Sequence, residues 1–177
     1  MQAETYKSLA ALLTYPREDY KQRVQACEGL DAEIAEFRAA IALSSTVELQ
    51  ELFTRTFDLN PLCCLEIGWH LFGENYERGT LMVRMRQELR RYRLEESSEL
   101  PDHLAHVLRL LAGMEPERAS DFAGACVLPA LEKMLTAFQG KGNPFERLLV
   151  AVRRLVRSDF PEIPLLQDPA PVLRVLS

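Results

Sequence analysis

The sequence predicts an all-α fold, a single-domain helical bundle of about nine helices. The chain of 177 residues has only eight glycines and no Asn-Gly or Asp-Gly dipeptide, so it lacks the common signals of β-hairpins. No segment alternates apolar and polar residues for long, whereas apolar residues recur at helical spacing. Because 47% of the residues are apolar, a chain of this length can bury one substantial core without disulfides or metals.

Turn-forming residues divide the chain into nine expected helices. Helix-interrupting residues stand at Pro16, Gly29, Asn60-Pro61, Gly73, Gly113 and Gly140–Asn143. The expected helices between them span residues 3–14, 18–28, 31–43, 46–57, 62–72, 75–93, 101–112, 116–138 and 144–157. We assign residues 1–157 to one helical domain and residues 158–177, which contain four prolines, to an extended C-terminal tail.

Two of these helices have specific N-terminal signals. Ser45-Thr46-Val47-Glu48 has the capping-box pattern, in which the serine and the glutamate each satisfy a backbone amide of the other residue. The helix over 101–112 begins with Pro101, because proline is tolerated in a first helical turn. Both starts are followed by apolar residues at helical spacing, as an amphipathic helix requires.

The last two helices have distinctive patterns. Pro129 lies inside the eighth, where its ring clashes with the preceding turn, so we expect a split or a kink there. In the ninth, Asn143 is the expected N-cap and Pro144 the first residue, with Glu146 reaching back to the cap amide. Its apolar residues form one continuous stripe: Phe145, Leu148, Leu149, Val152, Leu155 and Val156.

Charge and hydropathy limit the location and the partners. The net charge of −5 and the pI near 5.3 argue against a general nucleic-acid binder and favour a basic partner. The longest uncharged run, Phe122 to Leu131, has ten residues, whereas a membrane-spanning helix needs about 20. The N-terminus shows no secretion signal, so we expect a cytosolic protein.

Four cysteines without a Cys-x-x-Cys pair are expected as core thiols in a reducing compartment: Cys27, Cys63, Cys64 and Cys126.

Motifs for catalysis are absent from the sequence. It contains no phosphate-binding glycine loop, no Gly-x-Ser-x-Gly and no His-Glu-x-x-His, so nothing predicts an enzyme or a bound cofactor. One alternative is a helical metal-binding enzyme, in which Glu66 and His70 share one helix face and His103 and His106 share another. The other interpretation is that His70 and His103 are partly buried polar residues that fix helix contacts through hydrogen bonds.

Charged residues are segregated by sign between residues 84 and 102. A run with net charge +4 contains Arg84, Arg86, Arg90, Arg91 and Arg93, and the acidic run after it contains Glu95, Glu96, Glu99 and Asp102. The arginines could bind a phosphate backbone, or form a solvated face on which Glu88 pairs with a nearby arginine. The acidic run interacts favourably with the dipole of the helix that begins at Pro101, because negative charge near a helix N-terminus is stabilising. It would also attract a peptide that carries arginines.

The order of motifs in the first two thirds of the chain is the most specific signal. Leu-Leu-x-Tyr-Pro begins at Leu12 and Leu-Gln-Glu-Leu-Phe-Thr-Arg-Thr-Phe-Asp at Leu49, followed by Trp-His-Leu-Phe-Gly at Trp69, Glu-Arg-Gly-Thr-Leu-Met at Glu77 and Glu-Leu-Pro-Asp-His-Leu at Glu99. In this combination the chain resembles the dedicated chaperones that mature molybdenum oxidoreductases. It is most similar to the nitrate reductase delta subunit branch (NarJ type), and more distantly to the TMAO and dimethyl sulfoxide reductase chaperones (TorD/DmsD-like).

The resemblance implies an all-helical, cofactor-free cytosolic chaperone rather than an enzyme. Such proteins bind the N-terminal segment of a molybdoenzyme catalytic subunit and hold it for molybdenum cofactor insertion, and some restrain premature export or membrane docking. By motif match, Asp102 and His103 correspond to the Asp-His pair implicated in leader-peptide recognition. Ala105 and Phe72 depart from the usual family residues, which leaves the client open. Contact with molybdenum-cofactor insertion proteins, and the choice between monomer and dimer, also stay open.

A helix-in-groove mode gives such recognition a physical basis, because a disordered client segment can fold as an amphipathic helix against an apolar groove. The expected peptide-binding residues are Trp69, His70, Phe72, Leu100, Asp102, His103 and Leu104. The apolar ones would form the walls, and Asp102 would bond a client Arg or Lys. The competing interpretations are core packing for the apolar residues and a capping or pairing role for Asp102. The hypothesis requires an open cleft with Asp102 and His103 reachable from solvent.

Overall fold

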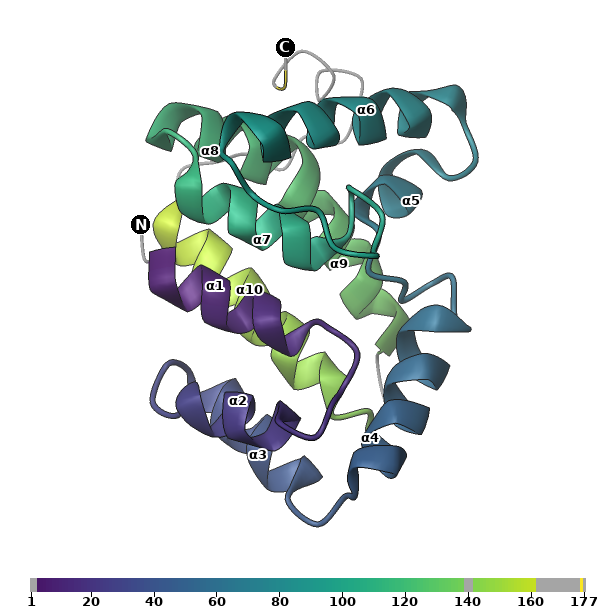
Figure 1. Ribbon diagram of the computed structural model, residues 1–177, viewed down its shortest axis with the longest axis vertical. Coiled ribbons are helices and arrows are strands. Elements are labelled where there is room, and N and C mark those ends of the chain that lie inside the picture. The colour runs from purple at the N-terminus through teal and green to yellow at the C-terminus, as the bar shows by residue number, and fades with distance from the viewer. Residues whose placement is uncertain (1–2, 139–141, 162–175, 177) are drawn as a thin grey trace.

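The computed structural model describes residues 3–138, 142–161 and 176 (Figure 1). Its helices are α1 (Ala3–Leu12), α2 (Tyr20–Ala26), α3 (Ala32–Ile41), α4 (Thr46–Phe53), α5 (Ile67–Phe72), α6 (Tyr76–Arg91), α7 (Leu104–Gly113), α8 (Pro116–Phe122), α9 (Leu128–Phe138) and α10 (Phe145–Asp159). The π-helical segment η1 (Thr54–Asp58) continues α4, and η2 (Ala123–Val127) joins α8 to α9. With continuous runs counted once, the described residues form nine helical segments and no strand beyond an isolated bridge, which confirms the all-α prediction.

The helices pack around α1 and α10. Figure 1 shows α1 between α7 and the α2–α3 pair, and α1 contacts α7, α10 and α2. Helix α10 also packs on α3 and α9, and its whole predicted stripe, from Phe145 to Val156, is buried. Helix α5, which follows α4 and η1 in the chain, lies against α6 and α9. The core is therefore one continuous apolar cluster, as expected for a single domain.

The predicted helix starts are confirmed in part. Ser45 Oγ accepts the Glu48 N–H at 3.2 Å, and the Glu48 carboxylate accepts the Ser45 N–H at 2.7 Å, so the capping box is present. Asn143 Oδ1 accepts the Phe145 N–H at 3.0 Å, but α10 begins at Phe145 rather than at Pro144. Both signals act within one turn of chain, which is why the sequence reveals them.

Two predicted helices begin at least three residues later than expected. The helix expected from residue 62 begins at Ile67, and the helix expected from Pro101 begins at Leu104. The cause is an antiparallel bridge between Glu66 and His103. In it the Leu104 N–H donates to the Leu65 carbonyl at 2.7 Å, and the Ile67 N–H donates to the Asp102 carbonyl at 3.0 Å. These backbone groups bond across the bridge and not along a helix, so both helices start after it.

The eighth expected helix forms without separating into two. The interruption expected at Pro129 takes the form of η2, the five residues that directly precede α9. Proline lacks an N–H and its ring crowds the carbonyl four residues earlier, and the wider π-helical turn accommodates both. The chain therefore remains helical from Pro116 to Phe138.

The C-terminal tail is only partly covered. Helix α10 continues to Asp159, two residues past its expected end, and most of the tail expected over 158–177 lies outside the described residues. Cys27, Cys63 and Cys126 are buried and Cys64 is half-buried, which confirms the expected packing for three of the four. Among the described residues, no helix combines the length and the apolar content that crossing a bilayer demands.

Candidate functional site

The bridge between Glu66 and His103 brings together two motifs that are far apart in the sequence. It joins the entry to α5, which carries Trp69 and His70, to the entry to α7, which carries Asp102 and His103. Helix α6 closes the arrangement from one side, because it packs on α5 and also contacts α7. The motif segments therefore form one site, built around a short stretch of paired backbone.

Asp102 lies at the inner side of this site and is fully buried. Its Oδ2 accepts the Gly68 N–H at 3.2 Å and the Arg78 Nε–H at 3.4 Å. Burial raises the pKa of the Asp102 carboxyl, and the Arg78 charge opposes that rise. Asp102 therefore anchors α5 and α6 to the entry of α7, and its carboxylate offers no solvent-facing oxygen for the direct bond to a client Arg or Lys that we expected.

Gly68 and Trp69 shape the surroundings of this ion pair. A Cβ on Gly68 would lie 2.5 Å from Asp102 Oδ2 and 3.0 Å from Leu81 Cδ2 of α6. Only glycine therefore fits at this position of α5. The Arg78 guanidinium stacks over the half-buried Trp69 ring at 5.6 Å from its centroid. Trp69 thus adds a cation–π contact to Arg78, the basic partner of this ion pair.

His103 is the N-cap residue of α7. Its Nδ1 accepts the Ala105 N–H at 3.2 Å, which leaves the hydrogen of the neutral ring on Nε2. Burial lowers the pKa of His103 to about 3, and the neighbouring His106 contributes to the same shift. The ring is therefore neutral near pH 7. The His103 side chain lines a surface cavity but is only 4% exposed, and Asp102 is fully buried, so the requirement that both residues be reachable from solvent is not met.

This acidic cavity has a volume of about 410 Å³ and an unusual lining. Its residues are Tyr15, Phe53, Phe57, Asp58, Cys64, Leu65, Glu66, Glu99 and His103. Three are carboxylates and three are aromatic, and none of them is Lys or Arg. Tyr15 and Phe53 meet edge to face with ring centroids 5.8 Å apart, as do Phe53 and Phe57 at 4.9 Å. The lining therefore matches a cation that carries some apolar surface.

The π-helical segment η1 supplies one wall of the acidic cavity. It continues α4 beyond Phe53 and contains Phe57 and Asp58, both of which line the cavity. A π-helical turn is wider than an α-helical one and shifts the direction of the side chains that follow it, and such turns are frequent at functional sites. Beyond η1, the exposed side chains of Leu59 and Leu62 adjoin this wall in the sequence.

The seven residues expected to bind peptide take different positions. His103 lines the acidic cavity, and Leu100 is exposed beside Glu99. Trp69 and His70 are half-buried on α5, whereas Phe72, Asp102 and Leu104 are buried. The residues that we missed include Tyr15, Asp58 and Glu99, although all three belong to the quoted motifs. Those motifs could have pointed to them.

The four residues of the metal-binding alternative do not converge. His70 Nε2 lies 2.7 Å from the Cys64 carbonyl oxygen, and His106 Nε2 accepts the Ser97 N–H. A different group does form, in which one potential ligand atom from each of Glu66, Glu99 and His103 lies within 4.8 Å of the others. With Nδ1 bonded to the Ala105 N–H and the hydrogen on Nε2, the His103 ring could ligate a metal only by giving up its helix cap. Burial raises the pKa of the Cys64 thiol beside this group to about 12, so it is protonated at neutral pH.

Two arginines of the basic run, Arg86 and Arg91, form ion pairs within the protein. Arg86 bonds Glu96 at 2.7 Å, and the buried Glu88 pairs with Arg118 at 3.0 Å and with Arg91, three residues along, at 3.8 Å. This confirms the expected pairing of Glu88 with an arginine at helical spacing. It gives the nucleic-acid alternative little support, because two of the five arginines face carboxylates within the same protein.

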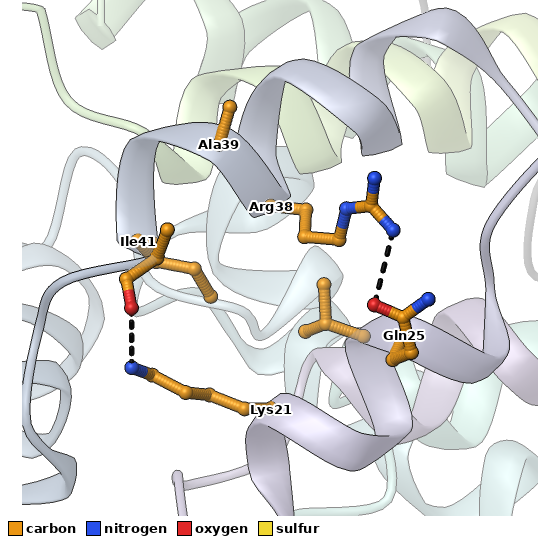
Figure 2. Close-up of a pocket in the computed structure, with 7 residues that line it drawn as sticks. Lys21, Gln25, Arg38, Ala39 and Ile41 are labelled. Atoms are coloured by element: carbon orange, nitrogen blue, oxygen red, sulfur yellow. Dashed lines mark hydrogen bonds between the residues drawn. The ribbon is translucent and has the colours of Figure 1, made fainter.

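A second cavity, of about 430 Å³, lies between α2 and α3 (Figure 2). Lys21 Nζ donates to the Ala42 carbonyl at 2.7 Å, and Arg38 Nη1 donates to Gln25 Oε1 at 3.0 Å. Both cations therefore serve to join α2 to α3. None of the expected site residues lines this cavity, so we place the candidate site at the acidic cavity.

The chain matches a known protein family. A family model described as the nitrate reductase delta subunit matches residues 24–145 of the chain. The matched range contains both sides of the Glu66–His103 bridge and all lining residues of the acidic cavity except Tyr15. A search of curated proteins finds no match.

Proposed function

Since this chain belongs to the nitrate reductase delta subunit family, we propose that it is a maturation chaperone that binds the N-terminal segment of a molybdoenzyme catalytic subunit. In this proposal it holds the segment while the molybdenum cofactor is inserted, before export or membrane docking of the client. It acts by binding alone, catalyses no reaction and needs no cofactor of its own.

The observation that carries the proposal is the acidic cavity beside the Glu66–His103 bridge. Asp58, Glu66 and Glu99 face it without a lysine or arginine in its lining, and aromatic rings complete its walls. A guanidinium or ammonium group gains charge-assisted hydrogen bonds from carboxylates and cation–π contact from the rings. The cavity therefore takes the basic side chain of a client segment, the role that Asp102 was expected to fill.

The apolar surface next to the acidic cavity supports binding of a helical segment. Tyr15, Leu59, Leu62 and Leu100 are 42%, 75%, 64% and 45% exposed. Tyr15 lines the cavity, Leu59 and Leu100 each follow a lining residue, and Leu62 lies between Asp58 and Cys64 of the lining in the sequence. Micromolar affinity needs about 8 kcal/mol, and ordering a disordered peptide costs about 2–5 kcal/mol of the gross interaction. Contact with these side chains supplies the apolar part of that energy, and the basic side chain fixes the register.

The expected site residues divide into contact roles and supporting roles. Trp69 and Leu100 are accessible enough to touch a client, whereas Asp102 and Leu104 hold the two motif segments in place from inside. The His70 ring bonds the carbonyl of Cys64, which lines the acidic cavity, and the His70 carbonyl accepts a bond from Lys133 Nζ at 2.6 Å. His70 therefore supports the edge of the cavity at Cys64. We therefore propose contact roles for the first pair and supporting roles for the rest.

Titration of a labelled peptide tests the proposal. The probe is the fluorescein-labelled N-terminal segment of the nitrate reductase catalytic subunit from the same organism, with a second peptide in which norleucine replaces each basic residue. We expect saturable binding of the first peptide, weaker binding of the second, and about tenfold loss of affinity for the first in Glu66→Gln and in Glu99→Gln.

Glu117→Gln is the matched control, because Glu117 is an exposed carboxylate on α8 that lines none of the described cavities near the bridge. It should bind both peptides as the unmodified protein does. Absence of saturable binding for every such leader peptide would refute the proposed function. Equal affinity for the basic and the norleucine peptides would remove the acidic cavity from it.

A further inference from the structure

The segment Ser97–Leu100, between α6 and α7, is held in place by one buried imidazole. His106, in the first turn of α7, is 1% exposed. Its Nε2 lies 3.1 Å from the Ser97 backbone nitrogen and 3.0 Å from Ser97 Oγ, and its Nδ1 lies 3.0 Å from the Leu100 carbonyl oxygen. One side chain therefore bonds both ends of a four-residue segment that has no helical hydrogen bonds of its own.

The two backbone partners fix the protonation of this ring. A carbonyl oxygen only accepts, so Nδ1 of His106 carries the hydrogen, and a backbone N–H only donates, so Nε2 presents its lone pair to Ser97. The ring is neutral in this arrangement, and both nitrogens are engaged. His106 is thus committed to the segment and unavailable to a metal.

The held segment forms a wall of the acidic cavity. Glu99 lines that cavity, and together with Ser97 and Ser98 it also lines a neighbouring cavity of about 300 Å³. Tyr15 and Glu99 are the residues that both cavities share, so they form the partition between them. The position of Glu99 therefore decides the size of the acidic cavity and the distance of its carboxylate from Glu66.

Few other bonds restrain the segment. The Glu99 N–H donates to Ser97 Oγ at 3.2 Å, which is a bond within the segment itself. Outside its N-terminal end, Arg109 Nη1 donates to the Glu95 carbonyl at 2.9 Å and Arg86 Nη2 donates to the Glu96 carboxylate at 2.7 Å. The Leu100 carbonyl also accepts the His103 N–H at 3.0 Å. Ser97 itself is bonded to the body of the protein by His106.

We propose that His106 is a positioning residue for client recognition: it sets the affinity for a basic client side chain by holding Glu99 at the acidic cavity, without touching the client. This inference rests on the proposed function for its binding consequence. Its structural part, control of the Ser97–Leu100 segment by one imidazole, needs no client.

Amide exchange tests the structural part. The Ser97 N–H is protected by His106, so His106→Ala should speed Ser97 exchange by about tenfold or more while amides in α10 keep their protection. His106→Gln retains an acceptor for the Ser97 N–H and should restore part of the protection. Val107→Ala, the next residue on α7 and fully buried, is the matched control and should leave Ser97 exchange unchanged.

A double-mutant cycle tests the binding part with the basic and norleucine peptides defined above. We expect His106→Ala to weaken the basic peptide about tenfold and the norleucine peptide less than twofold, and to add less than about twofold in the Glu99→Gln background. Unchanged Ser97 exchange in His106→Ala, or additive effects of the two substitutions, would overturn the inference. Failure of the unmodified protein to bind any leader peptide refutes the proposed function instead, and the exchange result then stands apart from it.

Discussion

Arg78 Nε lies 3.4 Å from Asp102 Oδ2, in a pair whose acid is fully buried and whose base is one fifth exposed. The pair joins α6 to the entry of α7, and the same Asp102 oxygen also accepts the Gly68 N–H at the start of α5. Three helices thus depend on one carboxylate. Asp102 therefore acts as an internal anchor between helices. The carboxylates that a ligand can reach are those of Glu66 and Glu99, which line the acidic cavity.

Replacement of Asp102 should therefore act on stability first. Asp102→Ala leaves the Arg78 guanidinium without its partner, and we expect the free energy of unfolding to fall by about 3 kcal/mol, measured by urea denaturation. Glu99→Gln, which removes a carboxylate facing a cavity, should change it by less than about 0.5 kcal/mol. Unchanged stability of Asp102→Ala together with lost peptide binding would restore a direct contact role for Asp102.

Two glycines offer a matched pair of substitutions. A Cβ at Gly68 would collide with Asp102 Oδ2 at 2.5 Å, so Gly68→Ala should destabilise by about 3 kcal/mol through overpacking and a displaced ion pair. A Cβ at Gly79, inside α6, meets no atom within 4 Å, so Gly79→Ala should be neutral or stabilise by up to about 1 kcal/mol. Thermal melts of both variants check the contrast, and similar melting temperatures would argue against close packing at Gly68.

His103 should make the protein sensitive to mild acid. Its pKa is lowered to about 3 in the folded state, so below the unfolded value of about 6.5 only the unfolded chain takes up the proton. Stability is therefore lost as pH falls through that window, by about 2 kcal/mol between pH 7 and pH 5. Burial raises the pKa of Asp102 and Glu66, which acts in the opposite direction at lower pH.

His103→Asn isolates this contribution, because asparagine keeps an N-cap acceptor for the Ala105 N–H and does not titrate. Urea denaturation at several pH values gives the free energy of unfolding as a function of pH. Between pH 7 and pH 5 its slope should be smaller in the variant by about 1 kcal/mol per pH unit. Identical slopes in the two proteins would mean that His103 takes up its proton in the folded state as well.

The exposed leucines after η1 should matter for binding alone. Leu59 and Leu62 are 75% and 64% exposed, so Leu59→Ser and Leu62→Ser remove little buried surface and should leave the melting temperature unchanged. Each should weaken leader-peptide binding by about fivefold to tenfold in the fluorescence titration. Leu43→Ser, at a fully exposed leucine between α3 and α4, is the control and should bind normally. A loss of equal size in all three would point to nonspecific contact.

Metal addition should leave the protein unaffected. The Glu66, Glu99 and His103 group has ligand atoms within 4.8 Å of one another, but the His103 ring is committed to capping α7. We expect no rise in melting temperature with Zn²⁺ in about tenfold molar excess over protein. A rise that disappears in Glu99→Gln would instead assign a metal site to this group.

Local sequence signals predicted the helices because those signals act over one or two turns. The Ser45 capping box and the Phe145–Val156 stripe both formed where their residues predicted. The motif order also led to the family that the family model confirms. Asp102 shows the limit of such local patterns. Three residues from Glu99 in the sequence, it carries the same charge, but the turn before Leu104 directs Asp102 inward while Glu99 faces the acidic cavity.

The sequence by itself determined that this chain forms a helical bundle, since helix periodicity and caps are properties of neighbouring residues. Only the tertiary structure decided which acids are accessible. That outcome depends on the pairing of Leu65–Ile67 with Asp102–Leu104 and on the meeting of Tyr15, η1 and Glu99 at one surface. Such contacts join segments tens of residues apart, and their energies come from burial and backbone bonding that no local pattern encodes.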